Sequence, residues 1–403
     1  MEKNLIEAEE SRALAHVEKV ANVELIPGAV NIVKIKVLGW NLIAMKDEFK
    51  EGDKCIYIEI DSKVPEDDIR FAFLSKRKYK IKTIKFNKFN VISQGIALPM
   101  YNFPELANKN IGDDVTKELR ITKIVTQEEV FLRKQKMIDQ NALPKFRFKW
   151  FRNFVLKHPK LKQYFINKEH KRILKEKSFP AWIQKTDEIR VENMPWILEH
   201  KLPLIETEKI DGTSTTFAIK FYNKRHTKYD FIICSRNVRM NKKGKTAKCF
   251  FDTDVYSEIA KKYSIENKLK ALANELHTDL IVLQGETYGD GIQGNPYKLP
   301  KNEIRFAAYN LKTGHKESKE YKFTRFNSIK SKEIISKYGI DWVPIVNISY
   351  LMPSTMEEFK AHAIGPSVIN TEVLREGFVY RSEFDENLSF KNVSNEYLLR
   401  HNN

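Results

Sequence analysis

The stretch Glu208-Lys209-Ile210-Asp211-Gly212 decides how this chain is interpreted, because a lysine beside Asp-Gly is suited to carry a nucleotide covalently. The amine is a nucleophile, the aspartate can hold a metal or a ribose, and the glycine lets the backbone approach a ligand closely. Lys-x-Asp-Gly also arises by chance in roughly one chain in ten of this length. The same residues could form a β-turn with a solvated lysine. The elements downstream must decide between a site and a turn.

Several downstream residues lie at the ends of expected strands. Arg236 follows a β-prone run and could clasp a phosphate or ribose. Glu286 stands after Gly285 and is a metal or ribose ligand or, taken singly, more often a turn cap. Phe306 offers an aromatic ring, which is usually core and sometimes a base platform. Glu376 precedes a glycine at a strand start, and Lys391 ends the last expected strand.

In this order the residues resemble the covalent nucleotidyltransferase superfamily of DNA ligases, RNA ligases and mRNA capping enzymes. Lys209-Ile210-Asp211-Gly212 is similar to motif I of the superfamily. The matches to the later motifs are Gly285-Glu286 for motif III, Phe306 for motif IIIa, Glu376-Gly377 for motif IV and Lys391 for motif V. Val393 stands where the wider superfamily commonly has a second lysine, which leaves Lys391 as the main motif V cation.

The N-terminal part carries a second resemblance. Tyr57-Ile58-Glu59-Ile60-Asp61-Ser62-Lys63-Val64-Pro65 and Ile92-Ser93-Gln94-Gly95-Ile96-Ala97-Leu98-Pro99 are similar to the N-terminal OB domain of RNA ligase family five. That ATP-dependent branch places an OB module before the nucleotidyltransferase domain. The match covers residues 12–125 and 179–400. Short β-prone runs separated by turn clusters independently suit a small closed barrel here.

The expected fold is α+β, an OB-like β-barrel followed by a ligase-type domain of mostly antiparallel sheets with peripheral helices. We expect an OB-like nucleic-acid-binding domain with its connector over 1–127, a basic helical insertion or linker over 128–178, and the nucleotidyltransferase domain over 179–403. The expected strands of the last domain are Leu204–Thr207, Thr215–Phe221, Asp230–Cys234, Leu280–Glu286, Ile304–Asn310, Gly377–Ser382 and Leu388–Lys391. Its expected amphipathic helices are Val255–Leu276, Thr324–Tyr338 and Thr355–Ala363.

The charge of the chain is strongly basic and unevenly distributed. The 403 residues contain 70 Lys and Arg against 53 Asp and Glu, a net charge of +17, which favours polyanionic partners. Residues 133–177 hold 15 Lys or Arg and 3 acids, with aromatic residues interleaved. Such a segment could clamp phosphates and stack on bases. A solvated helical spacer explains the composition equally well.

The sequence lacks the usual features of membrane and secreted proteins. No apolar run is long enough to span a bilayer, and the N-terminus MEKNLIEAEESR is charged where a signal peptide would be apolar. Cys55, Cys234 and Cys249 have neither CxxC spacing nor enough members for a zinc site or a disulfide framework. We expect a cytoplasmic protein, with a nuclear location also open, that acts as a monomer without a membrane partner.

The resemblance implies an ATP-dependent RNA ligase that seals 3′-hydroxyl and 5′-phosphate ends, with nicked duplexes as the expected substrate. Lys209, Lys391 and Glu376 are the expected catalytic residues. The expected nucleotide-binding residues are Glu208, Lys209, Asp211, Gly212, Arg236, Glu286, Phe306, Glu376 and Lys391. Asp211, Glu286 and Glu376 would hold Mg²⁺ or Mn²⁺, and Phe306 would stack on the adenine. The site should favour the neutral Lys209 amine through desolvation and nearby cations.

Three alternatives share part of this pattern. A DNA ligase and a GTP-using capping enzyme have the same motif I chemistry, but both usually place the OB domain after motif V. A non-catalytic nucleic-acid-binding protein would keep the charge and the barrel. The presence of Lys209, Glu286, Glu376 and Lys391 together argues against that third alternative.

Overall fold

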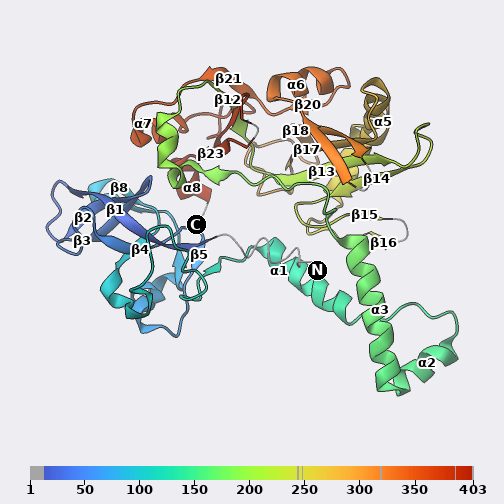
Figure 1. Ribbon diagram of the computed structural model, residues 1–403, viewed down its shortest axis with the longest axis horizontal. Helices are drawn as coiled ribbons and strands as arrows, with labels where there is room; N and C mark the ends of the chain where they lie inside the picture. The colour runs from blue at the N-terminus through green and yellow to red at the C-terminus, as the bar shows by residue number, and fades with distance from the viewer. Residues whose placement is uncertain (1–12, 243–244, 247, 318–319, 386, 402–403) are drawn as a thin grey trace.

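The chain forms an N-terminal β domain, a helical arm and a C-terminal α+β domain (Figure 1). The computed structural model describes residues 13–242, 245–246, 248–317, 320–385 and 387–401. The charged stretch 1–12, which we expect not to be a signal peptide, lies outside the described residues. Within the described part of the chain, no helix combines the length and the apolar character needed to cross a membrane.

The N-terminal domain is built around one long bulged strand. Its strands are β1 (Ala15–Leu25), β2 (Ile32–Val37), β3 (Trp40–Met45), β4 (Lys54–Ile58), β5 (Ser62–Lys63), β6 (Lys80–Ile81), β7 (Ile84–Phe86), β8 (Val91–Ser93), β9 (Ile96–Pro99) and β10 (Thr122–Lys123). β1 pairs with β4 through its first half and with β2 through its second half. A bulge between Val20 and Asn22 lies within the pairing with β2, next to the point where the pairing with β4 ends, and lets the sheet curl. A curled antiparallel sheet is the architecture expected for an OB-like barrel.

Three helices form the arm that projects between and beyond the two domains (Figure 1). They are α1 (Gln127–Gln140), α2 (Lys149–Lys157) and α3 (Pro159–Lys177). α1 begins with a capping box in which the Thr126 hydroxyl accepts from the Glu129 amide and the Glu129 side chain accepts from the Thr126 amide. The ion pair between Lys177 and Asp139, 2.7 Å long, joins the C-terminal ends of α3 and α1.

The C-terminal domain contains two mostly antiparallel sheets. The first has the order β11-β23-β22-β12-β21 and the second the order β14-β13-β17-β18-β19, with β20 paired to β18. The strands are β11 (Ile189–Arg190), β12 (Leu204–Lys209), β13 (Thr213–Phe221), β14 (Tyr229–Cys234), β15 (Asn241–Lys242), β16 (Lys245–Thr246), β17 (Leu280–Gly289), β18 (Ile304–Glu317), β19 (Glu320–Arg325), β20 (Asp341–Trp342), β21 (Ile345–Tyr350), β22 (Gly377–Ser382) and β23 (Ser389–Val393). The chain crosses from the first sheet to the second between β12 and β13, so the Lys209–Gly212 segment lies where the sheets meet.

Four helices of this domain pack against the sheets, and a fifth, α8, also contacts the N-terminal domain. They are α4 (Val255–Lys262), α5 (Ile265–Glu275), α6 (Ser328–Ser336), α7 (Met356–His362) and α8 (Asn395–His401). The sequence predicted one helix over Val255–Leu276, which was wrong in its continuity. Ser264 has a φ of 50°, and this left-handed conformation ends α4 and starts α5. The predicted start of the next helix at Thr324 was also too early, since β19 continues to Arg325.

The two domains meet through backbone and side-chain contacts. The Gly39 amide donates to the Glu192 carbonyl at 2.8 Å, and Trp40 Nε1 donates to Asn193 Oδ1 at 2.6 Å. A Cβ atom on Gly39 would lie 2.8 Å from the Glu192 Cα, so the close approach requires glycine. Leu398 of α8 packs into the core of the N-terminal domain. The barrel is therefore fastened to the sheet that carries Lys209.

Candidate active site

Strand pairing brings the predicted lysine and its acid together. Lys209 ends β12 and lies opposite Gly377, the first residue of β22. Glu376 comes one residue earlier, and its Oε2 is 2.6 Å from Lys209 Nζ. Both side chains are largely shielded from solvent, at 26% and 14% exposed. The sequence predicted both residues for one site, and the register of two neighbouring strands explains why they meet.

Glu286 reaches the same place from the second sheet. It lies opposite Ser214 in the pairing of β17 with β13. Gly212 passes directly against β17, and a Cβ atom there would lie 2.4 Å from the Thr287 carbonyl oxygen. No side chain fits at that distance from a backbone oxygen, which explains the glycine of the motif.

Two tyrosines that the sequence did not single out hold Asp211. Tyr397 Oη of α8 donates to Asp211 Oδ2 at 2.7 Å. The Asp211 amide donates to Tyr297 Oη at 2.8 Å. Tyr397 and Asp211 are 186 positions apart in the chain, so no local pattern could have paired them. Both the carboxylate and the backbone of Asp211 are thus fixed before any ligand binds.

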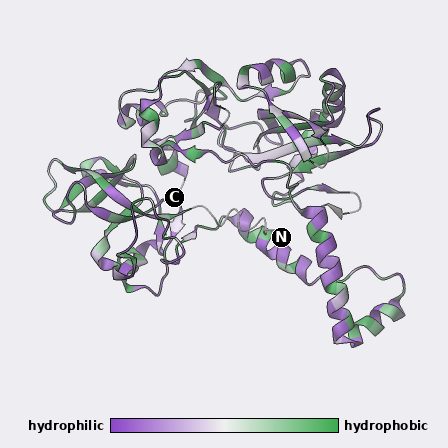
Figure 2. Cartoon of the chain, viewed as in Figure 1, coloured by the Kyte–Doolittle hydropathy of each residue, from purple (hydrophilic) through white to green (hydrophobic). Residues whose placement is uncertain are grey.

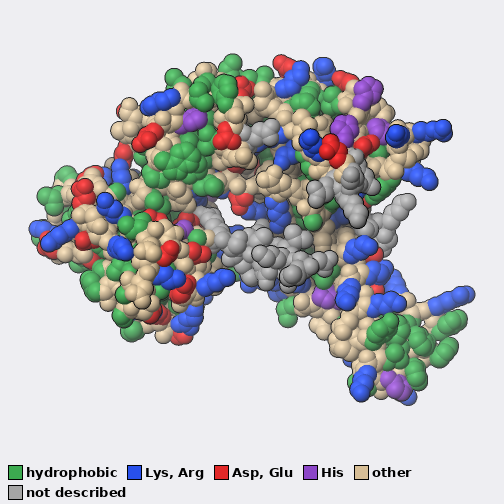
Figure 3. Space-filling view, viewed as in Figure 1, with side chains coloured by type: hydrophobic (Ala, Val, Ile, Leu, Met, Phe, Trp, Pro, Cys, Tyr) green, Lys and Arg blue, Asp and Glu red, His purple; other side chains and the backbone are tan. Residues whose placement is uncertain are grey.

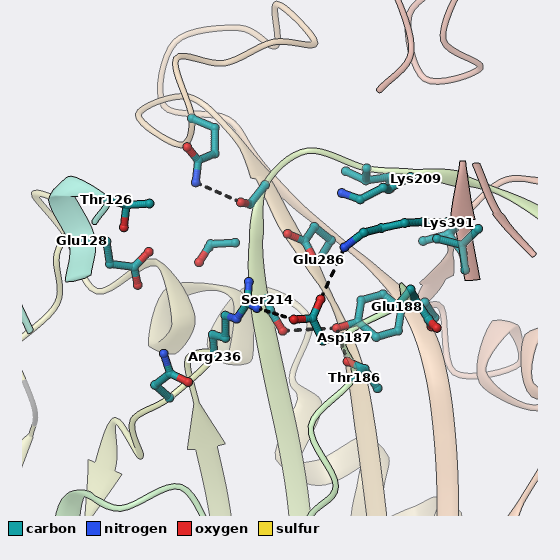
Figure 4. Close-up of a pocket in the computed structure, with 18 of the residues that line it drawn as sticks. Thr126, Glu128, Thr186, Asp187, Glu188, Lys209, Ser214, Arg236, Glu286 and Lys391 are labelled. Carbon is teal, nitrogen blue, oxygen red and sulfur yellow. Dashed lines mark hydrogen bonds and ion pairs between the residues drawn. The ribbon is translucent and has the colours of Figure 1, made fainter. Parts of the chain in front are cut away.

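A cavity of about 510 Å³, within the range of ligand pockets, lies beside these residues. Asp211 and Glu376 are not among the residues that line it, although both are adjacent to lining residues. Lys209, Gly212, Arg236, Glu286 and Lys391 are among the residues that line it (Figure 4).

The two predicted phosphate-binding cations converge on one acid. Asp187 Oδ2 accepts from Arg236 Nη2 at 2.9 Å, and its Oδ1 lies 3.4 Å from Lys391 Nζ (Figure 4). Asp187 was not predicted as a site residue. An aspartate between two cations occupies a position suited to a phosphate.

One wall of the cavity comes from the arm. Thr126, Glu128 and Leu132, at the start of α1, line it opposite the strands (Figure 4). Phe131 of α1 packs edge-on against Phe250 with ring centroids 5.9 Å apart. The sequence predicted this segment only as a linker or insertion, because nothing in a helix start indicates which cavity it will close.

The anionic groups of the site are crowded. Burial raises the pKa of Glu286 to about 8, and Glu376 and Asp211 add to the shift while Lys209 opposes it. Burial likewise raises the pKa of Asp211 to about 6, with a further contribution from Glu376. Three carboxylates in one half-buried place disfavour one another's charge. A cation would relieve that repulsion.

The expectation that the site favours the neutral amine assumes Lys391 and a divalent cation beside Lys209, and it stays a prediction. Burial lowers the pKa of Lys209, but Glu376, Asp211 and Glu286 outweigh burial and the pKa is raised. Lys391 does not counter them directly, because it lies against Asp187. The lysine is therefore an ammonium in this state of the site.

Two of the predicted nucleotide contacts take a different position. Phe306 is fully buried in the core, where its ring packs over Gly285 and edge-on against Phe217 at 5.2 Å. It presents no face to the cavity, so its predicted role as an adenine platform was wrong. Tyr309 lines the cavity instead. It lies three residues further along β18, at the bulge opposite Gln284 and Gly285, where the regular alternation of faces is interrupted.

The Glu208 side chain is directed away from the catalytic groups. Its carboxylate accepts from the Ser367 hydroxyl at 2.5 Å and from the Val368 amide at 2.7 Å. Its amide donates to the Pro344 carbonyl. Glu208 therefore anchors the neighbouring loop, and any part it takes in the cavity comes from its main chain.

The described residues contain no group of three or more His, Cys, Asp or Glu arranged to hold a metal by themselves. The predicted ligands Asp211, Glu286 and Glu376 still fit a cation by charge and donor type, because they are oxygen donors whose mutual repulsion raises the pKa of two of them. Mg²⁺ usually keeps several waters and binds one or two carboxylates plus phosphates. The metal site therefore stays a prediction, in which these carboxylates would hold the cation together with water and phosphate ligands.

Comparison with protein families gives two matches. The model of an OB-fold domain matches residues 14–100, and the model of the RNA ligase family matches residues 202–393. None of the curated proteins matches the sequence significantly.

Solved structures of an RNA ligase from Naegleria gruberi are similar along almost the whole chain. The ligase with pyrophosphate is 28% identical, with 97% of this chain and 99% of that chain covered and a TM-score of 0.71. A variant with ATP and Mn is 27% identical over 96% and 99% of the two chains, also with a TM-score of 0.71. An apo variant is 28% identical over 97% and 98%, again at 0.71. The likeness therefore includes both domains and their order, and the chain belongs to the RNA ligase family, in the branch of polynucleotide ligases whose nucleotidyltransferase domain follows an N-terminal OB-fold domain.

Proposed function

We propose that this enzyme joins a 3′-hydroxyl end of RNA to a 5′-phosphate end at the expense of ATP, through a lysyl-AMP intermediate and an adenylylated RNA end. The observation that carries the proposal is that Lys209, ion-paired with Glu376, lines a nucleotide-sized cavity together with Lys391 and Arg236. The similar Naegleria ligase binds ATP with Mn, and its complex with pyrophosphate contains the leaving group of the first step.

In the first step, Lys209 Nζ attacks the α-phosphorus of ATP. A P–N bond forms, the bond from that phosphorus to the bridging oxygen breaks, and pyrophosphate leaves. The amine must first lose a proton, and Glu376 Oε2, 2.6 Å away, is placed to accept it. Lys391 and Arg236 would exchange their contacts with Asp187 for the phosphates.

The carboxylate cluster sets the condition for this step. Asp211, Glu286 and Glu376 are the residues that would hold Mg²⁺ or Mn²⁺ next to Lys209. When bound, the metal would neutralise the charges that raise the pKa of Lys209 and would stabilise the negative charge on the transferred phosphate. Tyr397 and Tyr297 would keep Asp211 in place throughout.

The adenine has an apolar place in the same cavity. Ile210, Val343 and Val379 line it beside the Lys209 strand. We assign the base to this part of the cavity in place of a stack on Phe306.

The later steps use the same cations. AMP passes from Lys209 to the 5′-phosphate of the RNA, which forms a P–O–P linkage as the P–N bond breaks. The 3′-hydroxyl then attacks the RNA phosphate and AMP leaves. We assign 1–127 to RNA binding, 128–178 to a basic helical arm and 179–403 to nucleotidyl transfer, with nicked duplexes as the substrate class.

Incubation with α-labelled ATP and a divalent ion, followed by denaturing electrophoresis, tests the first step. The wild-type chain should retain the label. Lys209→Ala should lose it, and Lys209→Arg should lose it too, because it keeps the cation but not the nucleophile. Label that survives in Lys209→Ala would refute the assignment. Label from GTP alone would indicate capping chemistry, and sealing assays with RNA or DNA on each side of a nick would define the substrate.

A further inference from the structure

The outer end of the arm exposes aromatic side chains to solvent. Phe148, Trp150, Phe154 and Tyr164 are 53%, 68%, 47% and 58% exposed. Figure 3 shows hydrophobic side chains gathered at this end of the molecule, with Lys and Arg around them. Figure 2 shows hydrophobic and hydrophilic residues side by side along α2. We call this surface, formed by residues 145–164, the arm tip.

The arm tip has its own small core, which fixes these rings. Phe146 packs edge-on against Phe151 at 5.5 Å and against Phe165 at 5.1 Å. Val155 of α2 is fully buried. The exposed rings pack against this core, since Trp150 and Phe154 contact Phe151 and Tyr164 contacts Phe165. These contacts hold the rings in position while a large part of each side chain stays exposed.

The exposed rings also contact one another and the cations beside them. Phe148 and Trp150 stack with centroids 6.3 Å apart at an angle of 25°. The Arg147 guanidinium lies 5.4 Å from the Phe148 ring centre. Planar surfaces next to guanidinium and ammonium groups match a strand in which bases alternate with phosphates.

The charge of the segment supports a polyanion. Its three acids, Asp139, Glu169 and Glu176, are all engaged by Lys177 or Arg172. Among the described residues, the other Lys and Arg side chains of 133–177 form no ion pair with an acid. The surface therefore presents an excess of positive charge around its aromatic rings.

We propose that the arm tip binds a single-stranded segment of the RNA that extends beyond the nicked duplex, with bases stacked on Trp150, Phe148 and Tyr164 and phosphates held by the adjacent Lys and Arg side chains. This inference rests on the proposed function for the identity of the nucleic acid. The helix α1 begins in the wall of the active-site cavity, so the arm leads directly outward from the reacting ends. α3 alone, with 19 residues, extends about 28 Å at 1.5 Å per residue. RNA close to the junction therefore lies nearer to the active site than the arm tip does, and only RNA further from the junction contacts the arm tip.

Trp150→Ala tests the stack, with Trp196→Ala as the matched control because Trp196 is 57% exposed in the other domain. The probe is a single-stranded uridine oligonucleotide on the order of 20 nucleotides long, which exceeds the 4–16 nucleotides that an OB fold covers. Trp150→Ala should weaken binding by about fivefold or more, and Trp150→Phe should restore most of it, since one stacked base contributes roughly 1–3 kcal/mol. Trp196→Ala should bind as the wild type does.

Charge and chemistry are measured separately. Arg147→Ala with Lys149→Ala should reduce the slope of log K against log salt by about 0.7 for each phosphate that these side chains neutralise in the wild type. Label retained from ATP should be unchanged in all of these variants. If the wild-type chain retains no label but Trp150→Ala still binds RNA more weakly, the proposed function fails and the arm surface stands. Equal RNA binding by Trp150→Ala and wild type overturns the arm surface, as does Trp150-dependent binding to anionic phospholipid vesicles with no effect on RNA.

Discussion

Replacing Tyr397 by phenylalanine removes one hydroxyl group from the site and leaves the rest of a 4% exposed side chain in place. The hydroxyl donates to Asp211 Oδ2 at 2.7 Å. A hydrogen bond to a charged group contributes about 1.5–3 kcal/mol. If Asp211 must be held in this position for adenylyl transfer, the rate of Lys209 labelling should fall about tenfold to a hundredfold, at about 1.4 kcal/mol per tenfold.

The pH profile gives a second readout of the same change. The pKa of Asp211 is about 6, raised first by burial, and the Tyr397 hydrogen bond is among the influences that lower it. Loss of that bond should raise the pKa further. Because the ionised carboxylate is the active form, the acidic limb of the labelling rate should move to higher pH in Tyr397→Phe. A purely structural defect would lower the rate without moving the limb.

Tyr338→Phe is the matched control. Tyr338 Oη donates to Glu275 Oε2 at 2.5 Å, a tyrosine–carboxylate bond at the surface between the turn after α6 and the last residue of α5. That variant should label Lys209 at the wild-type rate. A Tyr397→Phe enzyme with the wild-type rate and an unmoved acidic limb would refute the role of α8 in holding Asp211.

Two further predictions concern charge and domain contact. Glu286 has a folded-state pKa of about 8 against an ordinary value of 4.5, so its ionisation destabilises the metal-free fold progressively between these values and fully above about pH 8. In EDTA at pH 9, Glu286→Gln should therefore have a higher Tm than wild type, with a free energy of unfolding larger by an amount on the order of a few kcal/mol. Mn²⁺ should stabilise the wild type more than the variant. A lower Tm for the variant in EDTA would contradict the proposed repulsion among the carboxylates. Gly39→Ala should lower the Tm by the equivalent of about 1–3 kcal/mol, because its Cβ would lie 2.8 Å from the Glu192 Cα, and melting curves that coincide with wild type would show that the contact can shift freely.

The sequence predicted the parts of the site that depend on chain order. Lys209 ends β12 and Glu376 directly precedes β22, whereas Glu286 and Lys391 lie within β17 and β23. The pairing of β12, β22 and β23 in one sheet, and the crossover from β12 to β13 in the other, bring the four residues to one site. The N-terminal barrel was likewise predictable, because its short strands and turns are local features.

Other parts of the site depend on tertiary contacts that the sequence does not encode locally. Tyr397 reaches Asp211 only because α8 folds back across the sheet. The face that Phe306 occupies is set by the phase of β18, which a bulge opposite Gln284 and Gly285 shifts. Neither a bulge position nor a returning helix can be read from residue spacing, so these assignments required the structure.

Tyr397 and Leu398 are consecutive residues of α8, yet the first touches Asp211 and the second sits in the core of the barrel domain. Two consecutive residues thus connect the N-terminal domain, which we propose to bind RNA, with Asp211 of the active site. A torque on the barrel from a bent or misaligned duplex would be transmitted to that carboxylate without any loop having to rearrange. Mechanical coupling of this kind would make the transfer of AMP to the RNA end depend on the geometry of the bound duplex.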